Sequence, residues 1–260
     1  MSEPIRFLQL SDMHLIFQAP ESDRLGTLLA RTFRPLEVVR RLLRAERSWR
    51  PDFLLLTGDL ADRGGDTEYA ALRRALAEEM PGVPWVALPG NHDDRAAFRR
   101  SFLRVPPQEP LDRVCNFGGL RVVTLDTGVD GVISSGQVEW LVRQLAADAP
   151  RGTVLALHHP LYAQSPMPPA RYPPEFARLI AGSRLAGIFC GHTHENYFGS
   201  FEGVPYVTAD ACSFAVEEED GRLFARLCAG YLRAQIGGSG LSVQMKRAAP
   251  DGVPNARFPI

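Results

Sequence analysis

Histidine in this chain occurs only in short polar clusters that follow apolar runs. The six histidines are His14, His92, His158, His159, His192 and His194. Aspartate or asparagine accompanies several of them, as Asp12 accompanies His14 and Asn91 precedes His92. Imidazole nitrogens with carboxylate and amide oxygens, and no thiolate, suit borderline-hard divalent ions such as Zn, Mn and Fe. The clusters therefore predict a metal site.

Seven side chains form the candidate ligand set: Asp12, His14, Asp59, Asn91, His158, His192 and His194. Asp59 is the natural bridge in this set, because a carboxylate can share its charge between two ions. Two ions about 3.5–4 Å apart can hold a hydroxide nucleophile and clamp a phosphoryl oxygen. We therefore expect two Fe, Mn or Zn ions per chain and a hydrolase of phosphoesters.

Five apolar runs of strand length precede these clusters, and amphipathic helical patterns separate them. The predicted strands are residues 5–10, 53–57, 85–89, 153–157 and 186–190, followed by 196–201, 205–209, 213–216 and 224–235. The predicted helices lie around 36–43, 67–79, 95–103 and 135–147. This alternation is typical of mostly parallel sheets covered by helices. We predict an α/β fold, a four-layer α/β/β/α sandwich of two mixed sheets flanked by helices.

Ligands of such sheets bind outside the carboxyl ends of the strands, so the clusters should meet at one edge. One domain is expected over residues 1–236, and a C-terminal tail over 237–260 that is mobile or forms an interface. Residues 17–33 and the proline-rich stretch 161–175 are expected to be long loops.

Composition excludes several classes of protein. Of 260 residues, 45% are hydrophobic and 23% charged, which is typical of a globular chain. Lys and Arg number 29 against 30 for Asp and Glu, so the net charge of −1 argues against a nucleic-acid polymer as partner. No apolar run reaches the length of a membrane span, and no secretory signal is visible. We expect a cytoplasmic protein whose four cysteines are reduced.

The motif order D-x-H, G-D, G-N-H-D, H-H-P and G-H-T-H over residues 7–194 strongly resembles the calcineurin-like metallophosphoesterases. The resemblance implies that the first ion is held by Asp12, His14, Asp59 and His194. It implies that the second ion is held by Asp59, Asn91, His158 and His192. His92 would not be a ligand in that family, but would face the substrate and donate a proton to the leaving-group oxygen.

The run GDLADRG at 58–64 resembles an element of the serine/threonine phosphatase branch. There the second aspartate, here Asp62, would orient His92, and Arg63 would contact phosphate. A turn residue paired with Arg63 is the plainer interpretation of Asp62. For His159, a role facing substrate competes with simple packing, and Asp93 is expected to cap the following helix.

Longer segments resemble bacterial class III cyclic nucleotide phosphodiesterases and their glycerophosphodiesterase relatives. They are GDLADRG, PGNHDDR at 89–95, residues 110–128 and LALHHP at 155–160, with Leu161 in place of a second proline. The resemblance implies a homodimer that hydrolyses small phosphodiesters, cyclic AMP or GMP first. Alternatives are a glycerophosphodiesterase, a phosphomonoesterase or nucleotide pyrophosphatase, and a non-enzymatic interaction module. Tyr162 and Tyr172, in the proline-rich loop, are candidates to contact substrate.

Overall fold

Two β-sheets face each other in the computed structural model, which describes residues 3–163, 165–248 and 257–259. The first sheet has the strand order β13-β12-β1-β2-β3. Its strands are β1 (Ile5–Leu10), β2 (Phe53–Thr57), β3 (Trp85–Leu88), β12 (Ala229–Gly237) and β13 (Gly240–Ala248). β1, β2 and β3 are parallel, so their carboxyl ends lie at the same edge, whereas β12 runs antiparallel to β1.

The second sheet has the order β4-β5-β6-β7-β9-β8. Its strands are β4 (Arg113–Phe117), β5 (Leu120–Leu125), β6 (Thr153–Leu157), β7 (Leu185–Cys190), β8 (Tyr197–Phe201) and β9 (Val204–Thr208). β5, β6, β7 and β9 are parallel, and the edge strands β4 and β8 are antiparallel to their neighbours.

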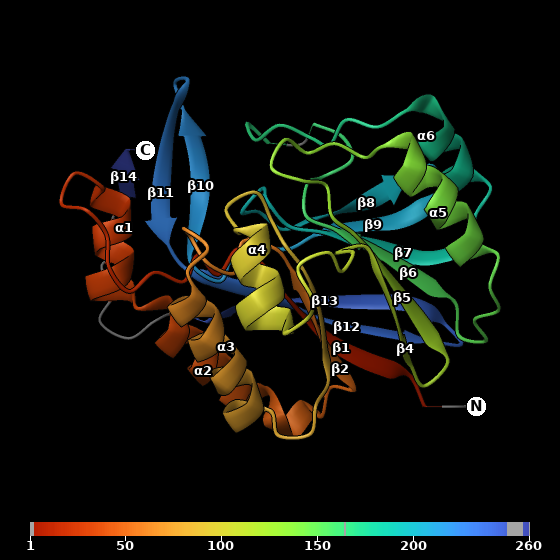
Figure 1. Cartoon of the computed structure of the whole chain (residues 1–260), viewed down its shortest axis with the longest axis horizontal. Helices are drawn as coiled ribbons and strands as arrows, with labels where there is room; N and C mark the ends of the chain where they lie inside the picture. The colour runs from red at the N-terminus through yellow and green to blue at the C-terminus, as the bar shows by residue number, and fades with distance from the viewer. Residues whose placement is uncertain (1–2, 164, 249–256, 260) are drawn as a thin grey trace.

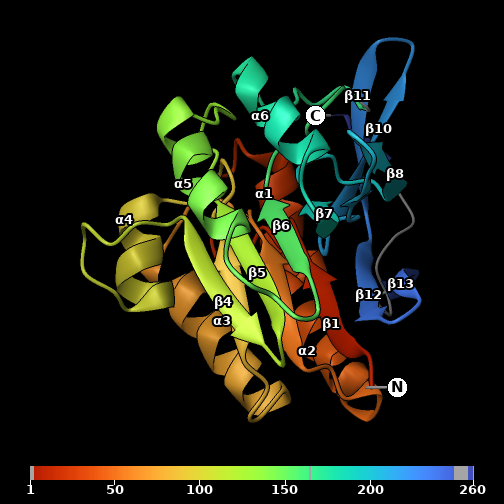
Figure 2. The same ribbon diagram turned by 90° about the vertical axis from the view of Figure 1, so that its right-hand side faces the viewer.

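Apolar side chains from both sheets form the layer between them. Phe53 of the first sheet lies between Phe7, at a ring distance of 4.8 Å, and Phe117 of the second sheet, at 4.1 Å. Helices α2 (Pro35–Glu46) and α3 (Asp66–Glu79) cover the outer face of the first sheet, and α5 (Ser135–Leu145) and α6 (Pro174–Ala181) cover the second (Figure 2). The predicted four-layer sandwich is confirmed.

The helices follow from local sequence. In α2, Val39 and Leu43 recur at the spacing of one helical turn and are fully buried against the sheet. In α5, Ser134 and Gln137 form a capping box that satisfies the first free N–H groups. The helix predicted near 95–103 is α4 (Arg95–Ala97) continued by η3 (Phe98–Leu103), and α2 continues into η2 (Arg47–Trp49).

Two predictions of local structure were wrong. Residues 17–33 are not a plain loop, because α1 (Arg24–Leu28) and η1 (Leu29–Phe33) occupy their second half. The strand predicted over 224–235 is two strands, β11 (Arg222–Leu227) and β12, which separate at Cys228. β11 pairs with β10 (Phe214–Glu219) and β14 (Arg257–Pro259) in a small third sheet, which projects beside α1 (Figure 1).

The C-terminal boundary predicted at residue 236 cuts through a hairpin. β13 pairs with β12 from Gly237↔Gly240 to Ala229↔Ala248, so residues 240–248 belong to the first sheet and not to a tail. Nine continuous pairs hold this strand in place, and a Gly-rich turn had hidden it from the sequence pattern. Residues 249–256 and 260 of the predicted tail lie outside the described residues. No helix in the described part of the chain is long and apolar enough to span a membrane.

Candidate metal centre

The candidate ligands lie in loops at the carboxyl ends of five strands. The first sheet supplies Asp12, His14, Asp59 and Asn91, which follow β1, β2 and β3, and the second sheet supplies His158, His192 and His194, which follow β6 and β7. Six of the seven fall into overlapping groups whose ligand atoms lie within 4.8 Å of one another, and Asn91 contacts His158. The structure thus brings together every residue of the predicted ligand set.

Left-handed backbone conformations are concentrated at these loops. Among the ligand positions φ is positive at Asp12 (50°), His14 (44°), Asp59 (49°), His192 (71°) and His194 (55°). Each such residue other than glycine costs roughly 1–2 kcal/mol, so the surrounding structure must enforce it. In two of the loops the affected residues are two apart, Asp12 with His14 and His192 with His194.

Hydrogen bonds between the loops enforce this backbone. The N–H groups of Asp12 and His14 donate to the carbonyls of Gly58 and Asp59, at 3.0 and 2.9 Å, so the first two loops run side by side. Gly90 must be a glycine, because a Cβ atom there would collide with the Asp59 carboxylate. The loops are therefore packed around the ligand side chains, with little room to rearrange.

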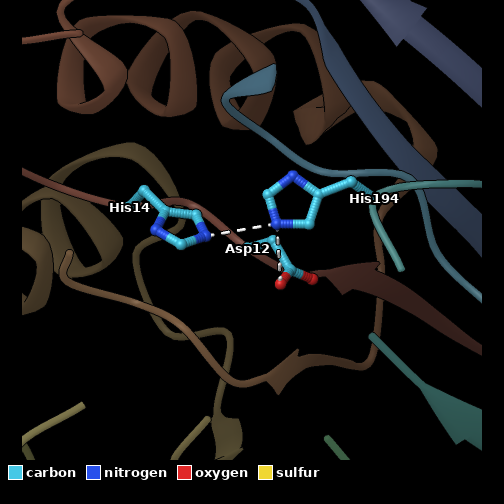
Figure 3. A group of neighbouring side chains, drawn as sticks. All are labelled: Asp12, His14 and His194. Atoms are coloured by element: carbon cyan, nitrogen blue, oxygen red, sulfur yellow. Dashed lines mark hydrogen bonds and ion pairs between the residues drawn. The ribbon is translucent and has the colours of Figure 1, made fainter. Parts of the chain in front are cut away.

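The first group contains Asp12, His14 and His194 (Figure 3). His14 Nδ1 donates to Asp62 Oδ1 at 3.0 Å, and His194 Nδ1 donates to the Phe214 carbonyl at 2.6 Å. Since both Nδ1 atoms donate outward, the two Nε2 atoms face each other 3.3 Å apart, and in neutral rings both would present lone pairs. Two lone pairs at this distance repel unless a proton or a cation lies between them.

The second group contains Asp59, His158 and His192, with Asn91 beside it. His158 Nδ1 donates to the Thr57 carbonyl at 2.8 Å, and its Nε2 lies 3.0 Å from Asn91 Oδ1. The amide oxygen is only an acceptor, so a neutral His158 again presents a lone pair to another lone pair. His192 Nε2 is buried without any hydrogen-bond partner.

Asp59 links the two groups, because it belongs to the second and also forms a group of its own with His14 and His92. Its Oδ2 lies 3.7 Å from His14 Nε2 and 3.3 Å from His158 Nε2, while its Oδ1 accepts the N–H of His92 at 2.8 Å. One oxygen is therefore held by the backbone, and the other points between the nitrogen donors of the two groups.

The electrostatics of the buried groups fit a site for cations. Burial raises the pKa of Asp12, but His194 and His158 outweigh this effect and lower the pKa to about 2. Burial lowers the pKa of His158, yet Asp59 and Asp12 raise it to about 9. Without an ion, imidazolium protons supply the positive charge that the carboxylates need, and a bound metal would displace them. The donor set fits a divalent metal, as does the buried His192 Nε2 atom, which has no hydrogen-bond partner among the described residues.

His92 lies at the open side of the centre, with 44% of its side chain exposed. Its Nδ1 donates to the main-chain carbonyl of Asp62 at 3.1 Å, and the Asp62 carboxylate is farther away, at 3.8 Å. The predicted partnership of Asp62 with His92 thus runs through the backbone, while the carboxylate contacts His14.

His159 and Arg63 have partners of their own. His159 Nδ1 is hydrogen-bonded to Thr127 Oγ1 at 2.7 Å, and its ring packs on His192 at 4.4 Å. Burial and the neighbouring His158 and His192 lower the pKa of His159 to about 2, so the ring is neutral. Arg63 forms an ion pair with Asp23 at 2.5 Å, so its charge is engaged with that carboxylate, which caps α1.

The two loop tyrosines pack against the core of the second sheet. Tyr172 donates its hydroxyl hydrogen bond to the Leu161 carbonyl at 3.0 Å, and its ring contacts Phe176 and Phe201. Tyr162 packs on Tyr206 at a ring distance of 5.0 Å. The hydroxyl of Tyr172 is thus committed to holding the loop, and contact of either ring with substrate stays a prediction.

Sequence reasoning missed the role of Asp93. Asp93 was predicted to cap the helix that follows it, but the cap of α4 is Asp94, which accepts the N–H of Ala97 at 2.7 Å. The buried Asp93 carboxylate accepts the N–H groups of Leu60, Ala61 and Gly90 and the hydroxyl of Tyr69. Burial and the nearby Asp59 raise its pKa. Asp93 therefore ties the loop after β2 to the loop after β3, and two consecutive aspartates were the only signal for it.

A four-layer sandwich that gathers carboxylates and imidazoles at its strand ends defines a metal-dependent phosphoesterase. A family model for calcineurin-like phosphoesterases matches residues 5–196, and the chain belongs to this family. The residues that carry the family motifs are those that the structure brings to the metal centre.

Individual relatives agree with this assignment. A cAMP/cGMP dual specificity phosphodiesterase of Mycobacterium tuberculosis is 34% identical over 97% of this chain and 79% of its own. The 3′,5′-cyclic adenosine monophosphate phosphodiesterase CpdA of Escherichia coli K12 is 30% identical over 74% of this chain and 70% of its own. A purple acid phosphatase from yellow lupin seeds has the same fold, with a TM-score of 0.64 and 16% identity over this whole chain and 54% of its own.

Proposed function

We propose that this protein is a dinuclear phosphodiesterase of small phosphodiesters, with 3′,5′-cyclic nucleotides as its first substrates. The observation that carries the proposal is the position of Asp59 Oδ2, 3.7 and 3.3 Å from nitrogen donors of two separate groups. A buried carboxylate oxygen that faces two sets of nitrogen ligands is the arrangement that a bridge between two neighbouring cations requires. The named activities of the mycobacterial and E. coli relatives support the choice of cyclic nucleotides.

The first ion would be held by Asp12, His14, Asp59 and His194. The second ion would be held by Asp59, Asn91, His158 and His192. Nitrogen and oxygen donors without thiolate favour Fe, Mn or Zn. When bound, the ions supply the charge that activates water and neutralises the phosphoryl oxygens.

His92 is the residue that serves the leaving group. Nδ1 of His92 keeps its proton, because the Asp62 carbonyl to which it is hydrogen-bonded can only accept. The nitrogen left to exchange a proton with the substrate is therefore Nε2, on a side chain that is 44% exposed. As water adds to phosphorus and one P–O bond breaks, Nε2 gives its proton to the departing ribose oxygen.

A hydrolysis panel with metal-reconstituted protein tests the substrate. It compares cAMP, cGMP, 2′,3′-cyclic nucleotides, glycerophosphodiesters and monoesters, and we expect the highest kcat/KM for the 3′,5′-cyclic nucleotides. A preference for glycerophosphodiesters or monoesters would favour an alternative enzyme on the same site. Hydrolysis of none of them would favour the non-enzymatic interaction module.

Homodimerisation and a cytoplasmic location belong to the same proposal. All four cysteines are free, which fits a reducing compartment. Light scattering coupled to gel filtration would measure the molecular mass, and we expect twice the chain mass of 28.7 kDa.

A further inference from the structure

Each candidate ion takes ligands from both sheets, so the distance between the sheets must be fixed at the site. For the second ion, Asp59 and Asn91 come from the first sheet, and His158 and His192 come from the second. A small slide of one sheet along the other would separate Asn91 from His158, which now lie 3.0 Å apart. A contact that couples the two strand-end loops, beside that of His158 Nδ1 with the Thr57 carbonyl, would therefore help to fix this distance.

Arg95 makes that contact. Its Nη1 donates to the carbonyls of Gly90 at 2.5 Å and Asp93 at 2.9 Å. These two carbonyls flank Asn91 and His92, so one guanidinium nitrogen holds the turn that carries both residues. The side chain is 18% exposed, which shields these hydrogen bonds from water.

The other end of the same guanidinium reaches the second sheet. Nη2 of Arg95 donates to Asp126 Oδ1 at 2.8 Å, in the loop after β5. Asp126 is itself fixed, since its N–H donates to Asp112 and its carbonyl accepts from Gln137. The next residue, Thr127, is hydrogen-bonded to His159, the neighbour of His158.

We propose that the Arg95–Asp126 pair is a brace between the sheets that sets the geometry of the second metal site. Both are positioning residues, since neither belongs to the ligand set. The planar guanidinium is needed because three acceptors must be reached at once, which a lysine ammonium on a flexible stem does not do in the same geometry. Of the ligands of the first ion, Asp12, His14 and His194 have no hydrogen bond to Arg95 or Asp126 among the described residues, and only the shared Asp59 is linked to the brace, through the N–H of His92. This inference rests on the proposed dinuclear site.

The test is a metal titration of the full chain with Mn²⁺, by equilibrium dialysis and elemental analysis. Arg95→Lys and Asp126→Asn should weaken the second ion by up to about 10- to 100-fold, the effect of losing an outer hydrogen-bond partner of a ligand, and should weaken the first ion much less, because only the shared Asp59 connects it to the brace. Because both residues act through one contact, the double variant should lose no more than the stronger single variant. Arg73→Lys is the matched control, since Arg73 also donates to a carbonyl, that of Phe102, far from these loops.

The outcomes separate the two proposals. Fewer than two ions in the unmodified protein would contradict the dinuclear site itself. Two ions in the unmodified protein, with unchanged affinities in both variants, would overturn the brace alone. Equal weakening of both ions would also overturn it, since a general loss of structure moves both. Should Arg95→Lys fail to fold, Asp126→Asn carries the test by itself.

Discussion

His14 Nδ1 donates a hydrogen bond to the Asp62 carboxylate at 3.0 Å, whereas His92 Nδ1 donates to the main-chain carbonyl of Asp62 and lies 3.8 Å from its carboxylate. A carboxylate on the outer nitrogen of a histidine fixes the tautomer and turns the other nitrogen inward. Asp62 thus acts on a candidate metal ligand through its side chain and on the candidate acid through its backbone. The two roles can be separated by substitution.

Asp62→Asn should weaken the ion held by His14 about 10- to 100-fold, because the outer partner of that ligand loses its charge. The carbonyl that holds His92 is unchanged by this substitution, so substrates with poor leaving groups should suffer no extra loss at saturating metal. Metal titration and kcat measure the two effects. Asp66→Asn, an exposed aspartate paired with Arg100, is the control. If Asp62→Asn binds metal normally but has a lower kcat only for substrates with poor leaving groups, the Asp62 carboxylate acts on His92 and not on His14.

Asp59→Asn should weaken both ions, whereas His14→Ala should weaken one. The reason is that Asp59 Oδ2 faces nitrogen donors of both groups and His14 belongs to the first. Elemental analysis after dialysis against a fixed concentration of free metal makes the comparison. If the Asn variant keeps one ion at full affinity, Asp59 does not bridge.

His92→Ala should lower kcat for ribose or alkyl leaving groups about 10²- to 10⁴-fold, the range of general acid catalysis. Esters of acidic phenols leave without a proton and should lose far less. Parallel assays of cAMP and a nitrophenyl diester give this ratio. An equal loss on both would assign His92 to binding the phosphate.

Asp93→Asn should lower the free energy of unfolding by about 1–3 kcal/mol, because its amide nitrogen would face buried N–H donors. It should also weaken metal binding, since Asp93 joins the loops that carry Asp59 and Asn91. Denaturant unfolding and metal titration check the two parts. Asp94→Ala removes the cap of α4 at a cost of about 1 kcal/mol and should leave metal affinity unchanged.

The ligand set could be predicted because strand ends are readable from a single sequence. Each apolar run ends within a few residues of its ligand, and parallel strands must end at one edge. The two layers of sheet followed from the same runs. The small third sheet could not be predicted, because the break at Cys228 lies inside a continuous β-like pattern and β14 pairs with β11 from far along the chain.

The hydrogen bonds that orient the ligands could not be predicted from the sequence for a different reason. Ser213 donates to the Asp12 carbonyl at 2.6 Å, and His194 donates to the Phe214 carbonyl, contacts that depend on the third sheet. Asp93 and Asp94 are adjacent, and the sequence does not fix the first residue of the helix closely enough to tell which of them is the cap. Left-handed backbone at five ligands is set by these tertiary contacts, and although aspartate and histidine adopt it more readily than most residues, their presence alone does not predict it.

In the proposed site two ions share Asp59 between the sheets. Anomalous diffraction from crystals grown with Mn²⁺ tests this most directly. Two anomalous peaks about 3.5–4 Å apart are expected, on either side of Asp59 Oδ2. One should lie within bonding distance of Asp12, His14 and His194, and the other within bonding distance of Asn91, His158 and His192. A single peak, or two peaks that do not share Asp59, would contradict the account.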